Sequence, residues 1–251
     1  MKAISLEFYK LRHKHLFSMI TMFMLGEIAW AFMAASMSFS RNPETAGWEP
    51  VIAMLSSMNG LFLPILCAIV VSRICDMENK GNTWKLLLSV SLKRGDIYKA
   101  KYICSCIIMS YATLIQIFAV AIYGKKSGFT QPLPTTLLIR YFIGIFIVNA
   151  VIIALQQWVS MAISNQAFSL CVGMIGGFIG LSADLFPIVI RRIFIWSYYS
   201  GLSPIIQLYE NEKMSFTVQN IGAPASLLAI IAMMGIIIYF LGSMYIESQE
   251  V

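Results

Sequence analysis

The chain has 251 residues, of which 59% are apolar and only 12% charged, with a mean hydropathy of +0.76. Soluble domains carry about a quarter charged residues, so this composition excludes an ordinary water-exposed domain. The net charge of +6 comes from Lys and Arg at the ends of long apolar stretches, which indicates membrane topology rather than nucleic-acid binding.

The N-terminal residues 1–15 are predicted to form an amphipathic helix in the membrane interface. Apolar residues repeat there at spacings of three and four, while charged residues share another helical face. A cleaved signal peptide is the alternative interpretation. The apolar run that follows is longer than a signal-peptide core and contains Glu27, which disfavours cleavage.

The sequence predicts an all-α integral membrane protein whose residues 1–251 form a single transmembrane domain. Its six spans are expected at 16–37, 50–72, 102–124, 141–163, 167–184 and 222–246. The fourth and fifth rest on one uncharged stretch with a single polar break. Residues 185–221 are predicted to be an outer interfacial segment, with Trp196, Tyr198 and Tyr199 at the headgroup level; together with Arg191 and Arg192 they could contact lipid headgroups or an amphipathic substrate.

The distribution of basic residues predicts that both termini are cytoplasmic. In that orientation eleven Lys and Arg residues lie inside, against seven outside. Cytoplasmic loops are usually the more basic ones. The predicted location is therefore a cell membrane crossed several times, of the bacterial plasma-membrane type.

Glu27 is a possible polar site within the membrane. It lies about twelve residues past His15, or roughly 18 Å along a helix, which places it deep in the bilayer. An ionisable group at that depth should face protein or water. It is either a polar group on the substrate path or permease interface, or a buried, hydrogen-bonded structural residue.

Other polar and small residues in the spans are predicted to serve packing. The amides of Asn149, Gln156 and Gln157 are expected to form hydrogen bonds between helices. Glycines in the fifth span are expected to let helices pack closely. They are Gly173, Gly176, Gly177 and Gly180.

The segment 73–101 is the sizeable polar connection expected on the cytoplasmic side. Asn82 or Thr83 is a plausible helix N-cap, and residues 84–88 read as a short amphipathic helix. A short helix anchored between two spans suits a soluble partner that moves them.

This segment resembles the cytoplasmic signature of type-two ABC exporter permeases, and most closely that of the lantibiotic-immunity and bacitracin-resistance group. The residues that carry the resemblance are Glu78, Gly81, Asn82, Thr83, Trp84, Lys85, Leu87, Leu88, Ser89, Arg94, Ile97, Tyr98 and Lys101. The resemblance implies that Glu78, Asn82, Thr83, Trp84 and Lys85 contact a separate ATP-binding cassette subunit. It also implies a second permease subunit, of the same or a related chain, and an amphipathic peptide substrate.

No catalytic residues, metal ligands or nucleotide site are predicted in the chain. It lacks a Walker motif, so ATP and magnesium are expected on the partner subunit. The alternatives are a permease for another hydrophobic substrate, an ion-driven carrier and an integral-membrane enzyme. An enzyme would need converging catalytic groups and a carrier an internal repeat, and neither pattern is evident.

Overall fold

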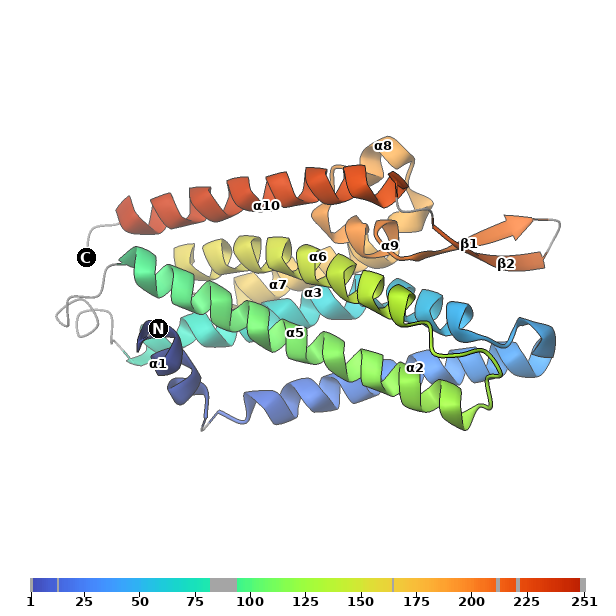
Figure 1. Ribbon diagram of the computed structural model, residues 1–251. Helices are drawn as coiled ribbons and strands as arrows, with labels where there is room; N and C mark the ends of the chain where they lie inside the picture. Colours follow the sequence, from blue (N-terminus) through green and yellow to red (C-terminus); the bar gives the residue numbers. More distant parts are fainter. Residues whose placement is uncertain are drawn as a thin grey trace.

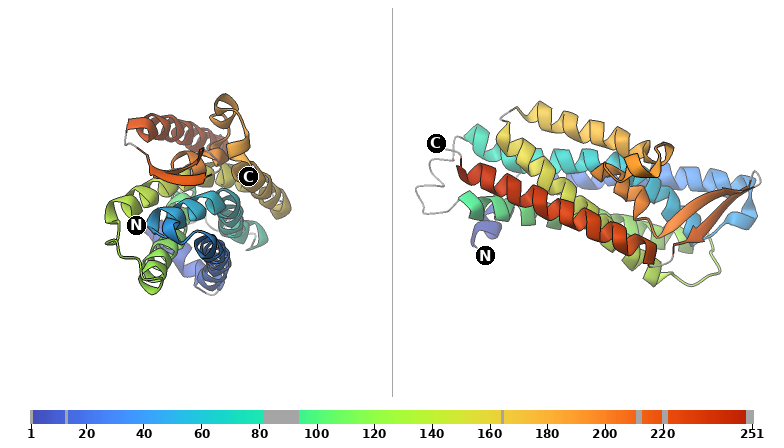
Figure 2. Two further views of the ribbon diagram at one scale, coloured as in Figure 1. Left: turned by 90° about the vertical axis from the view of Figure 1, so that its right-hand side faces the viewer. Right: turned by 90° about the horizontal axis from the view of Figure 1, so that it is seen from above.

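The computed structural model describes residues 2–12, 14–81, 94–163, 165–210, 213–219 and 222–248. Its long helices lie side by side in one elongated bundle (Figures 1 and 2). They are α1 (Lys2–Leu11), α2 (Leu16–Arg41), α3 (Trp48–Gly81), α5 (Arg94–Lys126), α6 (Thr135–Ala162), α7 (Gln166–Leu181) and α10 (Gly222–Ser248). Helix α1 and the C-terminal end of α10 lie at one end of the bundle (Figure 1).

Five of these helices are long and apolar enough to cross a membrane, among the residues that the structure describes. Each of the six predicted spans overlaps one helix, but α7 has only 16 residues. At 1.5 Å per residue it is about 24 Å long, which is shorter than the hydrocarbon layer. The structure therefore supports an all-α membrane bundle, and the sixth crossing stays a prediction.

Helix α3 is the central helix of the bundle. It packs against α2, α5, α6 and α7, and more than half of its apolar span is buried, compared with 17% for α10. The outward faces of the other helices are apolar, as lipid contact requires. The core thus lies around α3, and the polar side chains inside it are away from lipid.

A region of short elements lies at the end of the bundle opposite α1 (Figure 1). It contains the helices α8 (Ile188–Arg191) and α9 (Tyr198–Gly201) and an antiparallel hairpin of β1 (Ile205–Glu210) and β2 (Lys213–Val218). The register pairs Ile205 with Val218. This hairpin was not among the predicted elements, and the polar and apolar residues of β2 alternate, which suits a strand with one solvated face.

The N-terminal helix is shorter than the helix predicted over residues 1–15. Helix α1 ends at Leu11, and His15 has a φ of 50°, in the left-handed region. A residue other than glycine rarely adopts this backbone conformation except in a turn. Consequently His15 belongs to the turn before α2 and not to the apolar face of α1.

Three of the four predicted glycines of α7 allow it to approach α3 closely, whereas Gly176 faces the side chain of Trp196. A Cβ atom at Gly177 would lie 2.7 Å from the Leu61 carbonyl oxygen, and one at Gly180 would overlap the Gly60 carbonyl. Gly173 faces Ala68 in the same way. Close backbone approach of this kind stabilises helix pairs in lipid.

Replacing Gly180 with alanine is expected to lower the free energy of unfolding by about 1–3 kcal/mol, because backbone would have to move. Gly26 on α2 provides the matched control, since a Cβ atom there meets nothing within 4 Å. Gly26→Ala should leave stability unchanged or slightly raised. Thermal unfolding in detergent measures both, and equal midpoints for the two variants would contradict the close contact.

Candidate functional site

The end of the bundle that carries α1 also holds the predicted coupling segment. Glu78 belongs to the last turn of α3, and α5 begins at Arg94. Asn82, Thr83, Trp84 and Lys85 lie outside the described residues, so their predicted contact with an ATPase is untested. The structure does describe how the two flanking helices are held.

A buried ion pair ties α1 to α5 near the coupling segment. The Nζ atom of Lys101 lies 3.3 Å from Glu7 Oε2 and donates to the Ile74 carbonyl at 2.8 Å. Both charged side chains are withdrawn from solvent, with Lys101 0% and Glu7 3% exposed. Glu7, predicted to lie on a polar face, is therefore a buried link between α1, α5 and the last part of α3.

Two further contacts join the start of α5 to other helices. Gln157 Nε2 on α6 donates to the Tyr98 carbonyl at 2.8 Å. Arg94 lies 3.4 Å from the Ile246 carbonyl on α10. The first turns of α5 are thus joined by polar contacts to α1, α6 and α10.

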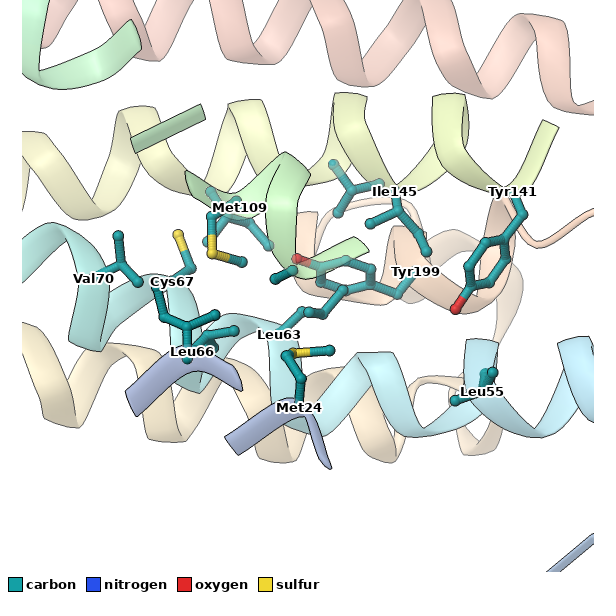
Figure 3. Packing of buried hydrophobic residues seen from close by; sticks show 14 of the residues in the cluster. Met24, Leu55, Leu63, Leu66, Cys67, Val70, Met109, Tyr141, Ile145 and Tyr199 are labelled. Atoms are coloured by element: carbon teal, nitrogen blue, oxygen red, sulfur yellow. The ribbon is translucent and has the colours of Figure 1, made fainter. Parts of the chain in front are cut away.

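A second group of polar side chains lies inside the bundle, between three helices. Tyr141 Oη donates to Gln116 Oε1 at 3.0 Å, and Gln116 Nε2 donates to Asn59 Oδ1 at 2.7 Å. Asn59 Nδ2 closes the ring by donating to Tyr141 Oη at 2.8 Å. Figure 3 shows the Tyr141 hydroxyl directed from α6 toward α3. The ring thereby fixes α3, α5 and α6 around one point.

Glu27 of α2 lies beside this ring. Its side chain is 0% exposed and lies near those of Gln116 and Tyr141. Neither carboxyl oxygen has a hydrogen-bond partner among the residues that the structure describes. Glu27 therefore faces protein rather than lipid, and its role stays a prediction.

Polar contacts continue from this ring toward the end with the hairpin. The Ser203 hydroxyl donates at 3.0 Å to the hydroxyl of Ser56, which lies one turn before Asn59 on α3. Tyr199 donates to Asn149 Oδ1 at 2.5 Å. Tyr199 is buried, as is Tyr198, so both side chains pack against protein, and their predicted depth at the headgroup level stays a prediction. Tyr199 anchors the short helices to α6.

The amides of the fourth span join helices, as predicted. Asn149 contacts α9 through Tyr199, and Gln157 contacts α5 through the Tyr98 carbonyl. Gln156 lies 3.0 Å from the Ser169 hydroxyl on α7. Their role in this bundle is to connect α6 with three neighbours.

The comparison with known families decides between the classes left open by the sequence. The model of the family described as ABC-2 family transporter protein matches residues 3–180. The chain belongs to this family. The match runs from α1 to the end of α7 and includes the coupling segment, Glu27 and the polar ring. No curated protein matches the chain.

Family membership identifies this ABC-2 permease as the membrane component of an ABC transporter and not as an enzyme. The two polar features then have places in such a molecule. The Glu7–Lys101 pair lies near the helix ends that flank residues 82–93, and Glu27 lies in the interior.

Replacing Glu27 with leucine is expected to stabilise the fold and to lower transport. A buried polar group without partners costs about 1–3 kcal/mol, and leucine of similar size removes that cost. Unfolding in detergent measures the first effect and a transport assay the second. Glu27→Gln keeps the shape and polarity but removes the charge. Full transport with both variants would exclude a functional role for Glu27.

Proposed function

We propose that this ABC-2 permease is the membrane half of an exporter that removes amphipathic antimicrobial peptides, of lantibiotic or bacitracin type, from the bacterial plasma membrane. It pairs with a second permease, identical or related, and with ATPase subunits that bind ATP and magnesium. The observation that carries the proposal is the family match across residues 3–180, which includes the signature at Glu78 to Lys101.

The arrangement of the bundle supports both termini being on the cytoplasmic side. Helix α1 and the C-terminal end of α10 lie at the same end as the helix ends that flank residues 82–93 (Figure 1). The excess of Lys and Arg at this end favours the cytoplasm. The end with the hairpin then faces outward.

The interior of the bundle supports an amphipathic rather than a strongly charged substrate. Apart from the Glu7–Lys101 pair near one end, the buried polar groups of the bundle are amides, hydroxyls and the carboxyl of Glu27, within the part of the chain that the structure describes. An amphipathic peptide already partitions into the membrane, so it needs a path to water and not a charged tunnel.

Copurification tests the proposal. The full chain, expressed with its neighbouring genes and purified in mild detergent, should retain a Walker-motif ATPase whose activity rises when the peptide is added. Cells lacking the chain should become sensitive to that peptide. A chain that purifies without any ATPase under conditions that preserve its fold would overturn the exporter assignment.

A further inference from the structure

A cavity of about 440 Å³ lies at the end of the bundle that carries the hairpin. Its wall is formed by α3, the short helices α8 and α9, the strand β1 and the first turns of α10. This volume is in the range of small-ligand sites. The cavity lies at the opposite end of the bundle from the coupling segment, and its lining includes neither Glu27 nor a residue of the polar ring. Neither the proposed ATPase contact nor the Glu27 site therefore accounts for it.

The lining of the cavity is basic and rich in hydrogen-bond donors. Hydroxyl and amide side chains surround Arg191 and Arg192, and Asp184 is the acidic residue in the lining. Arg191 is held by Asp184 at 2.9 Å and by the Ser200 hydroxyl at 2.7 Å. One of the two positive charges is therefore neutralised.

Arg192 carries the second positive charge of the cavity lining. Tyr198 Oη donates to its backbone carbonyl at 2.9 Å, which fixes the main chain there. Its guanidinium forms no ion pair with any residue the structure describes. An exposed guanidinium beside hydroxyl donors suits a phosphate group, which it can bind through two parallel hydrogen bonds.

The residues beside these arginines indicate where such a phosphate comes from. Leu185 is 85% exposed and Val189 75%, and Ile193 is also exposed. Large apolar side chains at the end of a membrane bundle insert into the acyl boundary, which places adjacent arginines at the headgroup level. Leu227 adds an apolar surface inside the cavity itself.

We propose that this cavity binds the phosphate headgroup of a membrane amphiphile, with Arg192 as the principal ligand and Arg191 beside it. The acyl chains would lie along the exposed side chains of Leu185, Val189 and Ile193. The site is assigned to a lipid and goes beyond the export of peptides, since it requires neither ATP nor a partner subunit.

Lipid binding to the full chain in an uncharged detergent tests the proposal. Dioleoyl phosphatidic acid and dioleoylglycerol have the same acyl chains and differ in the phosphate, and inorganic phosphate supplies the group without chains. Native mass spectrometry and thermal stabilisation should show binding of phosphatidic acid, much weaker binding of dioleoylglycerol and no stabilisation by inorganic phosphate.

Replacing Arg192 with glutamine should weaken phosphatidic acid binding by about tenfold to a hundredfold, as expected for losing charge-assisted hydrogen bonds. Arg41→Gln is the matched control, because Arg41 is an exposed arginine at the end of α2 and does not line the cavity. Equal binding of the two lipids, or equal loss in both variants, would overturn the assignment. So would inorganic phosphate that stabilises the chain as well as phosphatidic acid does.

This outcome is independent of the exporter assignment. An intact chain that binds phosphatidic acid but retains no ATPase would sustain the lipid site and refute the exporter. The opposite pair of results would do the reverse.

Discussion

Replacing Lys101 with methionine should lower the free energy of unfolding by about 3–5 kcal/mol. The substitution keeps the length of the side chain but leaves the buried Glu7 carboxylate without this partner, and it removes the donor to the Ile74 carbonyl. Lys10 still reaches the other Glu7 oxygen at 2.9 Å, so the lower end of the range is the better expectation. Denaturation in mixed micelles measures the change.

Two further variants separate the ion pair from general effects. Lys99→Met removes an exposed lysine two residues earlier on α5 and should change stability by no more than about 0.5 kcal/mol. The double variant Glu7→Gln with Lys101→Met should recover part of the loss, because the uncompensated charge is gone. If Lys101→Met is no more harmful than Lys99→Met, the pair does not hold α1 in place.

The burial of Glu7 illustrates what the sequence pattern misses. A charged residue in a short amphipathic helix is normally assigned to the polar face, and the periodicity of residues 1–15 favours that choice. Its partner Lys101 lies 94 residues further along the chain. No local sequence pattern predicts a contact between residues so far apart, although both charges were expected near the same membrane surface.

Glu27 illustrates the opposite case. Its depth follows from counting residues along an apolar span, and its burial could be predicted from the cost of exposing an acid to lipid. The ring beside it could not, since Asn59, Gln116 and Tyr141 come from three different helices. Polar residues in apolar spans were the available signal for these three.

The hairpin at 205–218 could be predicted only in part from the sequence. Residues 213–218 alternate in polarity, but residues 205–210 do not, and the two residues Asn211 and Glu212 that separate them match the spacing of a β-hairpin. The neighbouring aromatics and arginines favoured an interfacial segment instead. That interpretation concealed the hairpin, which supplies part of the cavity wall.

Combining Trp84→Ala with Lys85→Glu is expected to release the ATPase from the purified permease. Tryptophan at the centre of a contact commonly contributes 2 kcal/mol or more, and a reversed charge adds repulsion. A combined loss of about 4 kcal/mol corresponds to roughly a thousandfold weaker binding. Copurification followed by quantification of the bound ATPase measures it.

The matched control is Trp30→Ala with Lys126→Glu, which changes an exposed tryptophan on α2 and an exposed lysine at the far end of α5. This variant should keep the ATPase bound. An intact complex after the Trp84 and Lys85 changes would show that the ATPase docks elsewhere.

The position of Trp84 and Lys85 in the chain explains why their proposed contact with the ATPase should matter for transport as well as for binding. They lie in the stretch that joins α3 to α5, and α3 alone has 34 residues, or about 51 Å of continuous helix. A displacement at that joint is therefore carried along α3 to Asn59 and Ser56. Peptide resistance should consequently fall in parallel with ATPase binding, and resistance that persists without the ATPase would show that transport is driven from another contact.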